Sequence, residues 1–271
     1  MIGLLIENTL LGKTDKVKTA INRIIEFQNR NKDNKNILAF SGGKDSIVVY
    51  DLMKKSGIDF DAIYSPTSVD PPELIYYIKK HHPEVKFAKY KHNKNWEGYN
   101  EVTMWNLLRH RAIPPTRLAR YCCDELKERT GDIGDTIYTG VRWEESKKRS
   151  QQSMTGFWKK KIMVRPIIDW TKEDVWEYIR KNNLPYCKLY DEGWERIGCI
   201  GCPLGSNQKR ELKLYPKYKE NYIKAFNGMV KYRKNKGMDC SDWKTGQDIY
   251  NWWIGENKKN KNVLDNQCSM F

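Results

Sequence analysis

The sequence has no run of 18 apolar residues, which excludes a simple membrane-spanning helix. Residues 1–17, MIGLLIENTLLGKTDKV, contain a short apolar patch but neither a basic leader nor a small-residue cleavage site. No internal repeat or low-complexity domain is found either. We therefore expect a cytoplasmic protein with no membrane association, whose 271 residues suffice for a large domain or a domain with an appendage.

Acidic residues are fewer than basic ones, and the net charge is +15 with a pI near 9.3. A surplus of this size favours an anionic substrate or partner, and the Trp and Tyr residues interleaved with basic ones over 206–253 would suit a nucleic acid. Two simpler explanations stand beside this one. Lys and Asn are frequent throughout the chain, and aromatic residues at helical spacing more often form a core.

Short apolar runs alternate with amphipathic segments over the first two-thirds of the chain. The pattern predicts strands over 36–40, 61–66, 85–90, 135–141 and 162–167, and helices over 14–30, 47–57, 71–82 and 171–183. Such alternation is typical of an α/β fold, a mainly parallel, twisted sheet with helices on both faces. We expect this fold over residues 1–205 and a helical extension with a C-terminal tail over residues 206–271, where no strand pattern is found.

The hexapeptide SGGKDS follows the first of these strands. Two glycines between a strand and a helix let backbone N–H groups approach phosphate oxygens, and the helix N-terminus adds its positive end. The loop is not a Walker A motif, because Leu38 stands where the first glycine is required and Asp45 replaces a Ser or Thr. We expect nucleotide phosphates to bind this different loop, made of Ser41, Gly42, Gly43, Lys44, Asp45 and Ser46.

Within this loop, Lys44 and Ser46 are the expected phosphate contacts. Two roles stay open for Asp45, which could hold Mg²⁺ or cap the following helix.

Four of the seven cysteines gather in two short segments, the adjacent pair Cys122 and Cys123 and the CxxC pair Cys199 and Cys202. In a chain without an export signal, cysteines are more often ligands or reactive thiols than disulfides. Adjacent cysteines can hardly direct both sulfurs to one zinc ion, whereas an iron–sulfur cubane offers each sulfur its own iron. We therefore favour a cluster over zinc, with unliganded buried thiols as the alternative.

The chain resembles the phosphoadenosine-phosphosulfate (PAPS) reductase family of the PP-loop ATP pyrophosphatase superfamily. The resemblance spans roughly residues 36–205 and rests on SGGKDS, RYCCDELK (120–127), GVRWEESKKR (140–149) and the segment 166–204. It implies an adenine nucleotide alpha-hydrolase-like fold and an adenine nucleotide as substrate, which would be ATP, adenylyl sulfate or PAPS. In the cluster-bearing, adenylyl-sulfate reductase-like branch, it also implies a 4Fe–4S cluster on Cys122, Cys123, Cys199 and Cys202.

The same resemblance assigns substrate contacts to Arg142, Ser146 and Arg149, where guanidinium groups would grip phosphate or sulfate. A solvated loop of mixed charge is the alternative for these three residues. The resemblance also leaves room for a homo-oligomer.

Three functions are compatible with the resemblance. The first is the reduction of adenylyl sulfate or PAPS to sulfite, with Lys44 at the phosphates, Cys268 as the nucleophile and a thiol reductant as partner. The tail cysteines of such enzymes stand in a Glu-Cys-Gly-Leu/Ile-His context, which LDNQCSMF lacks, so Cys268 could also be an ordinary tail residue.

The second function is ATP-dependent sulfur transfer to DNA or tRNA, as in DNA phosphorothioation, with a cysteine desulfurase as sulfur source. The complete SGGKDS loop favours it, because this form is expected of enzymes that bind whole ATP. The third is a nucleotide-binding sensor without catalysis.

Overall fold

The structure is a computed structural model, and it describes residues 5–9, 12–31, 33–91 and 101–255. These residues form two compact units, each built from separate segments of the chain. Unit 1 comprises the residues up to Pro66, Pro71–Ala88 and Arg129–Ile197, and unit 2 comprises Thr67–Asp70, Lys89–Glu128 and the residues from Gly198 onward.

Unit 1 contains a six-stranded sheet in the order β5–β4–β3–β6–β8–β7. Neighbouring strands pair in parallel, except that β7 is antiparallel to β8. In the register of the central strands, Ile37 of β3 lies opposite Asp61 of β4 and Ile137 of β6. The strands are β3 (Asn36–Ala39), β4 (Asp61–Tyr64), β5 (Lys86–Phe87), β6 (Thr136–Tyr138), β7 (Thr155–Trp158) and β8 (Lys161–Val164). The predicted α/β fold with a mainly parallel sheet is confirmed.

Both faces of the central strands are covered. Successive residues of a strand point to opposite faces of the sheet, and Ile37 and Leu38 of β3 are both buried, as are Ile137 and Tyr138 of β6. Strands of this kind read as continuous apolar runs, which is why β3 was recognisable in the sequence.

The helices predicted in unit 1 are confirmed: α1 (Lys16–Glu26), α2 (Lys44–Ser56), α3 (Pro72–His81) and α6 (Lys172–Lys181). Their ends carry ordinary signals, since the Asp15 side chain caps α1, Thr171 opens a capping box at α6, and Gly57 ends α2 with φ of 73°. Two short 3₁₀ helices, η1 (Trp143–Glu145) and η2 (Lys188–Tyr190), and a hairpin of β1 (Ile6–Thr9) and β2 (Gly12–Asp15) complete the unit.

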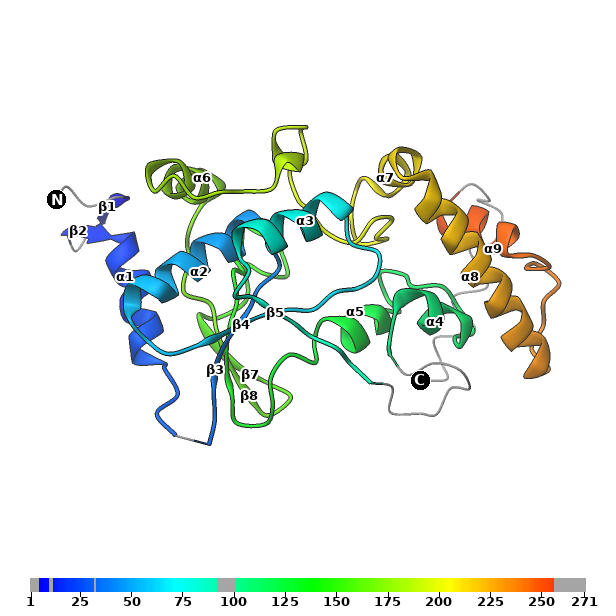
Figure 1. The fold of residues 1–271 in the computed structure, drawn as a ribbon, viewed down its shortest axis with the longest axis horizontal. Helices are drawn as coiled ribbons and strands as arrows, with labels where there is room; N and C mark the ends of the chain where they lie inside the picture. The colour runs from blue at the N-terminus through cyan, green and yellow to red at the C-terminus, as the bar shows by residue number, and fades with distance from the viewer. Residues whose placement is uncertain (1–4, 10–11, 32, 92–100, 256–271) are drawn as a thin grey trace. The chain divides into compact units, whose positions relative to one another are not determined.

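Unit 2 is helical, with α4 (Met104–Arg109), α5 (Tyr121–Leu126), α7 (Gln208–Leu214), α8 (Pro216–Asn235) and α9 (Gly246–Trp253). Helix α8 packs against α4, α7 and α9 (Figure 1). The aromatic residues predicted either to bind a polyanion or to fill a core are largely buried here, among them Tyr222, Trp243, Tyr250 and Trp253.

The helical character of the described part of the extension is thus confirmed. The division at residue 205 stays a prediction, and compactness groups the chain from Gly198 onward with Lys89–Glu128 instead. None of the helices in the described residues combines the length and the apolar character that crossing a membrane requires.

Candidate functional site

The SGGKDS loop lies at the point where the strand order of the sheet reverses. Strand β3 is the first of the six in the chain, β4 pairs with one of its edges and β6 with the other. In open α/β sheets, ligands bind beyond the carboxyl ends of the strands at such a switch point. The loop after β3 and the residues from Thr139 to Arg142 after β6 therefore occupy the usual position of a nucleotide site.

Hydrogen bonds within the loop hold its shape. The Ser41 N–H donates to the Ser46 hydroxyl at 3.3 Å, the Gly43 N–H to the Ser41 hydroxyl at 3.3 Å, and the Ser46 hydroxyl to the Gly43 carbonyl at 2.8 Å. Gly42 has φ of 71°, and a Cβ at this position would lie 2.8 Å from the Ile78 side chain. Both the backbone conformation and the close packing thus require glycine here.

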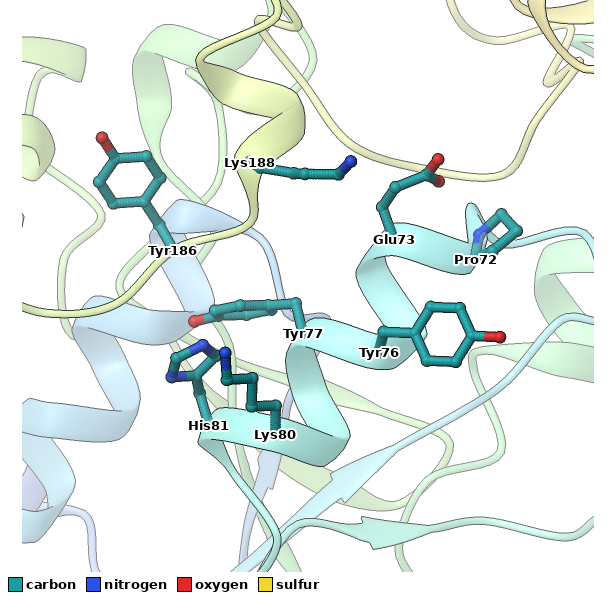
Figure 2. Close-up of a pocket in the computed structure, with 8 residues that line it drawn as sticks. All are labelled: Pro72, Glu73, Tyr76, Tyr77, Lys80, His81, Tyr186 and Lys188. Carbon is teal, nitrogen blue, oxygen red and sulfur yellow. The ribbon is translucent and has the colours of Figure 1, made fainter.

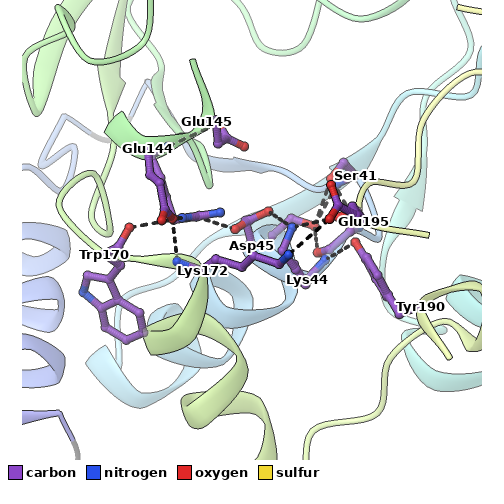
Figure 3. Close-up of polar contacts among 12 residues, drawn as sticks. Ser41, Lys44, Asp45, Glu144, Glu145, Trp170, Lys172, Tyr190 and Glu195 are labelled. Carbon is purple, nitrogen blue, oxygen red and sulfur yellow. Dashed lines mark hydrogen bonds and ion pairs between the residues drawn. The ribbon is translucent and has the colours of Figure 1, made fainter. Parts of the chain in front are cut away.

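Lys44 begins α2 and is buried with its charge beside the loop. Its backbone N–H donates to the Tyr190 hydroxyl at 2.9 Å (Figure 3). Its ammonium group lies 3.3 Å from Asp45 Oδ2, 3.4 Å from the Glu195 carbonyl oxygen and 5.7 Å from the centre of the Tyr190 ring. The segment after η2 therefore supplies contacts to the phosphate loop from a distant part of the sequence.

Arg142 joins the loop after β6 to the start of α2. Its Nε donates to Asp45 Oδ1 at 2.6 Å, and its Nη1 donates to Glu144 Oε2 at 2.7 Å and to the Trp170 carbonyl at 3.2 Å (Figure 3). The residue is 3% exposed. Asp45, for which two roles were open, is thus ion-paired in the first turn of α2, and the role of Arg142 in substrate binding stays a prediction.

Gly140 allows the two loops to approach. A Cβ at residue 140 would lie 2.8 Å from the backbone carbonyl carbon of Asp45, so any larger residue would push the loop after β6 away from α2.

Ser146 and Arg149 lie in a turn after η1. The Arg149 N–H donates to the Ser146 carbonyl at 2.9 Å, and the Arg149 guanidinium is ion-paired with Glu145. Ser146 is exposed, and this local environment matches the mixed-charge loop named as the alternative. A contact of either residue with substrate stays a prediction.

The four cysteines all belong to unit 2, and each is partly buried. Cys122 and Cys123 lie in the first turn of α5, and Cys199 and Cys202 flank a turn in which the Cys202 N–H donates to the Cys199 carbonyl at 3.2 Å. The Cys199 thiol also donates to the Thr67 hydroxyl at 3.4 Å.

The thiols of the two segments affect one another electrostatically. A hydrogen bond between the first pair raises the pKa of Cys122 and lowers the pKa of Cys123 to about 6. Burial and then the negative charges of Cys123, Cys199 and Cys202 raise the pKa of Cys122 further. The charge of Cys199 in turn raises the pKa of Lys127. Folding therefore brings the four sulfurs into one neighbourhood that also contains a cation.

In the described ranges, no three His, Cys, Asp or Glu side chains converge closely enough to hold a single metal ion. The four thiols of unit 2 therefore do not form a mononuclear zinc centre as they stand. Cys268, the predicted nucleophile, lies outside the described residues.

Two residues at the phosphate loop were not predicted from the sequence. Gly140 follows a predicted strand, and a glycine in that position signals a close backbone approach. Tyr190 carries no such signal, because its partner Lys44 lies 146 residues away in the chain.

Comparison with known proteins gives a family. The model of the phosphoadenosine phosphosulfate reductase domain matches residues 35–204. An adenosine 5'-phosphosulfate reductase of Oceanobacillus iheyensis is 30% identical over 177 residues, which cover 61% of this chain and 70% of that protein. An uncharacterized protein of Methanocaldococcus jannaschii is 32% identical over 239 residues, which cover 84% of this chain and 55% of that protein.

A second uncharacterized protein of that archaeon is matched over 42% of its length, so this chain spans about half the length of these two relatives. Among solved structures, the phosphoadenylyl-sulfate reductase of Candida auris is 17% identical, with a TM-score of 0.48 and coverage of 67% of this chain and 88% of that one. Since the family model covers more than half of the residues, the chain belongs to the phosphoadenosine phosphosulfate reductase family.

Proposed function

We propose that the protein is an adenine-nucleotide-dependent enzyme that reduces adenylyl sulfate or PAPS to sulfite. The observation that carries the proposal is the position of the SGGKDS loop, at the switch point of the sheet and with the buried Lys44 ammonium beside it. The family and its adenosine 5'-phosphosulfate reductases support the same substrate class.

In this proposal the nucleotide phosphate lies at the N-terminus of α2. The backbone N–H groups of Gly43 and Lys44 and the hydroxyls of Ser41 and Ser46 are the donors, and the Lys44 ammonium neutralises negative charge. Asp45 and Glu144 hold Nε and Nη1 of Arg142, which fixes the plane of its guanidinium group. Arg142, with Ser146 and Arg149, would face the sulfonate end of the substrate.

We also propose that Cys122, Cys123, Cys199 and Cys202 hold a 4Fe–4S cluster. A cubane gives each thiolate a separate iron, so its ligands need not converge on one point, and four mutually interacting, partly buried thiols fit this requirement. The Lys127 cation offsets part of the negative charge that four thiolates bring. When bound, the cluster would supply electrostatic support rather than a reacting atom.

The reaction would proceed through a covalent intermediate. The Cys268 thiolate attacks the sulfur of the sulfonucleotide, the bond between sulfur and the phosphate oxygen breaks, and the nucleotide leaves with the electron pair. A dithiol protein then attacks the cysteine sulfur and releases sulfite. Its second thiol resolves the mixed disulfide, which restores the Cys268 thiol and leaves the reductant as a disulfide.

ATP-dependent sulfur transfer to DNA or tRNA is the second candidate. It is favoured by one specific observation, the complete loop in which both serine hydroxyls and Lys44 surround the start of α2, as whole ATP would require. In this reaction pyrophosphate leaves, an oxygen of the nucleic acid is adenylylated, and sulfur from a cysteine desulfurase displaces AMP.

Parallel incubations of anaerobically purified protein separate these functions. A visible spectrum first reports the cluster, and the Cys123→Ser and Cys199→Ser variants should lose it while Cys240→Ser keeps it. Sulfite formed from adenylyl sulfate or PAPS with thioredoxin supports reduction, whereas AMP and pyrophosphate formed from ATP support sulfur transfer.

Two substitutions sharpen the result. Lys44→Met should weaken nucleotide binding by about 10- to 100-fold, while Lys18→Met on the exposed face of α1 should not change it. Cys268→Ser should abolish sulfite formation and leave nucleotide binding intact. Nucleotide binding with none of these products would overturn the proposal and identify a sensor.

A further inference from the structure

We propose that a groove between α3 and the segment that leads into η2 binds single-stranded nucleic acid. The groove has a volume of about 490 Å³ and lies within unit 1 (Figure 2). Its exposed walls carry two aromatic rings and three basic side chains, namely Tyr76, Tyr186, Lys80, His81 and Lys188, and one carboxylate, Glu73. None of these residues belongs to the phosphate loop, so the inference goes beyond the proposed function.

The two exposed rings can stack on bases. Tyr76 is 73% exposed, and Figure 2 shows its ring at one end of the groove and the Tyr186 ring at the other. The Tyr186 ring is held in place, because its hydroxyl donates to Asp191 at 3.0 Å and the ring packs edge-on against Trp176 at 5.2 Å. A ring that is already ordered loses little conformational entropy when a base stacks on it.

The floor of the groove is fixed as well. The Tyr77 hydroxyl donates to the Pro185 carbonyl at 2.7 Å, which ties α3 to the opposite wall. The Tyr77 ring lies 5.3 Å from the His81 ring. The groove is therefore built by α3 and residues 185–188 together and does not depend on one flexible side chain.

The charges in the groove suit phosphates. Lys80, His81 and Lys188 face one carboxylate, and the contact of Lys188 with Glu192 is an exposed ion pair at 3.7 Å, which a phosphate can replace at little cost. Figure 2 shows the Lys188 ammonium extending across the groove toward Glu73. The net charge of +15 would add a long-range attraction.

Single strands fit this combination better than other anions. A duplex keeps its base faces stacked inside, and an acidic peptide has no bases for Tyr76 and Tyr186 to stack on. The volume lies in the range of sites for nucleotide-sized groups, roughly 300 to 1,000 Å³. We therefore expect one or two bases in the groove and flanking phosphates at the lysines.

The test is fluorescence anisotropy of labelled 12-mers of uridine and of thymidine with the full chain, at low salt and without ATP. Tyr76→Ala/Tyr186→Ala should weaken binding at least about 10-fold, and Lys80→Gln/Lys188→Gln should reduce the salt dependence by about two phosphate contacts. Tyr76→Ala alone should also weaken binding, and it keeps the test valid where the double variant fails to fold.

Matched controls are Phe157→Ala, at a ring 83% exposed on β7, and Lys13→Gln/Lys18→Gln, at exposed lysines. These should leave affinity within about twofold. Absence of oligonucleotide binding, equal losses in the controls, or equal displacement by polyglutamate would overturn the proposal. Nucleotide binding at the phosphate loop is measured separately, so failure of the proposed function would be distinguishable from failure of the groove.

Discussion

The Tyr190 hydroxyl accepts the backbone N–H of Lys44 at 2.9 Å, at the first residue of α2. The first N–H groups of a helix have no partner within the helix, and phosphate-binding loops use them for phosphate oxygens. Tyr190 therefore fills one position that a nucleotide bound at this loop would need.

Tyr190→Phe should tighten nucleotide binding by about 2- to 10-fold, because the phosphate no longer competes with an intramolecular hydrogen bond. Isothermal titration with a non-hydrolysable ATP analogue measures the change, and the thermal midpoint checks the fold. Tyr186→Phe, which removes a hydroxyl bonded to Asp191, is the control and should leave affinity unaltered. Weaker binding by Tyr190→Phe would mean that the hydroxyl stays in place and donates to the ligand.

Gly140→Ala should lower the free energy of unfolding by about 1 to 3 kcal/mol and weaken nucleotide binding. The added Cβ would meet the Asp45 backbone at 2.8 Å, and backbone cannot move aside as a side chain can. Gly156→Ala on β7 is the control, because its Cβ would have no neighbour closer than 3.6 Å, at the flexible Arg165 side chain. Equal effects of the two variants in urea unfolding would contradict the role given to Gly140.

Arg142→Ala should lower the free energy of unfolding by about 3 kcal/mol or more, because it leaves the Asp45 carboxylate without its closest cation in a poorly hydrated position. Arg149→Ala removes an i,i+4 pair in an exposed turn and should change it by less than about 1 kcal/mol. Urea unfolding of both variants tests the contrast. Similar losses would show that the Arg142 pair is no more important than a surface ion pair.

Stability should fall as the pH drops from 6.5 to 4, partly through His82. Its ring lies 5.0 Å from the Phe40 ring and its Nε2 is 2.8 Å from the Tyr77 hydroxyl, and burial lowers its pKa from 6.5 to about 4. Below pH 6.5 the unfolded chain therefore takes up a proton that the folded protein refuses. The loss is on the order of 3 kcal/mol by pH 4 and absent above pH 7.

Comparison with His82→Gln isolates this contribution, because the variant retains every other titrating group. Urea unfolding at pH 7 and pH 4.5 should give a smaller decrease for the variant than for the unsubstituted protein. Identical decreases would assign the acid sensitivity to the carboxylates instead.

The sequence predicted the central elements because their signals are local. The strand over 36–40 is an uninterrupted apolar run, and the helix over 71–82 matches Pro72–His81 closely. Strand β7 was missed because its turn to β8 uses Lys159 and Lys160 at φ of 50° and 60°, where Asn or Gly would have signalled a hairpin. Helices α4 and α5 have six residues each, too few for a clear period.

The site was predictable in its residue types and less so in its contacts. Helix α2 begins at Lys44, three residues before the predicted helix, since the first turn is the phosphate loop itself. The pairing of Arg142 with Asp45 and of Tyr190 with Lys44 joins residues 97 and 146 positions apart, and no local pattern encodes such pairs. The roles assigned to these residues in binding and catalysis stay predictions.

The discontinuous construction of unit 2 affects how the chain is made. Leu107 and Leu108 on α4 share a core with Phe226 on α8, and about 100 residues separate the two helices in the chain. At about 5 to 20 residues per second, a ribosome would need roughly 5 to 20 s to synthesise the covering helix. During that interval the nascent chain exposes a sticky surface, so protein quality control would meet this chain chiefly during translation.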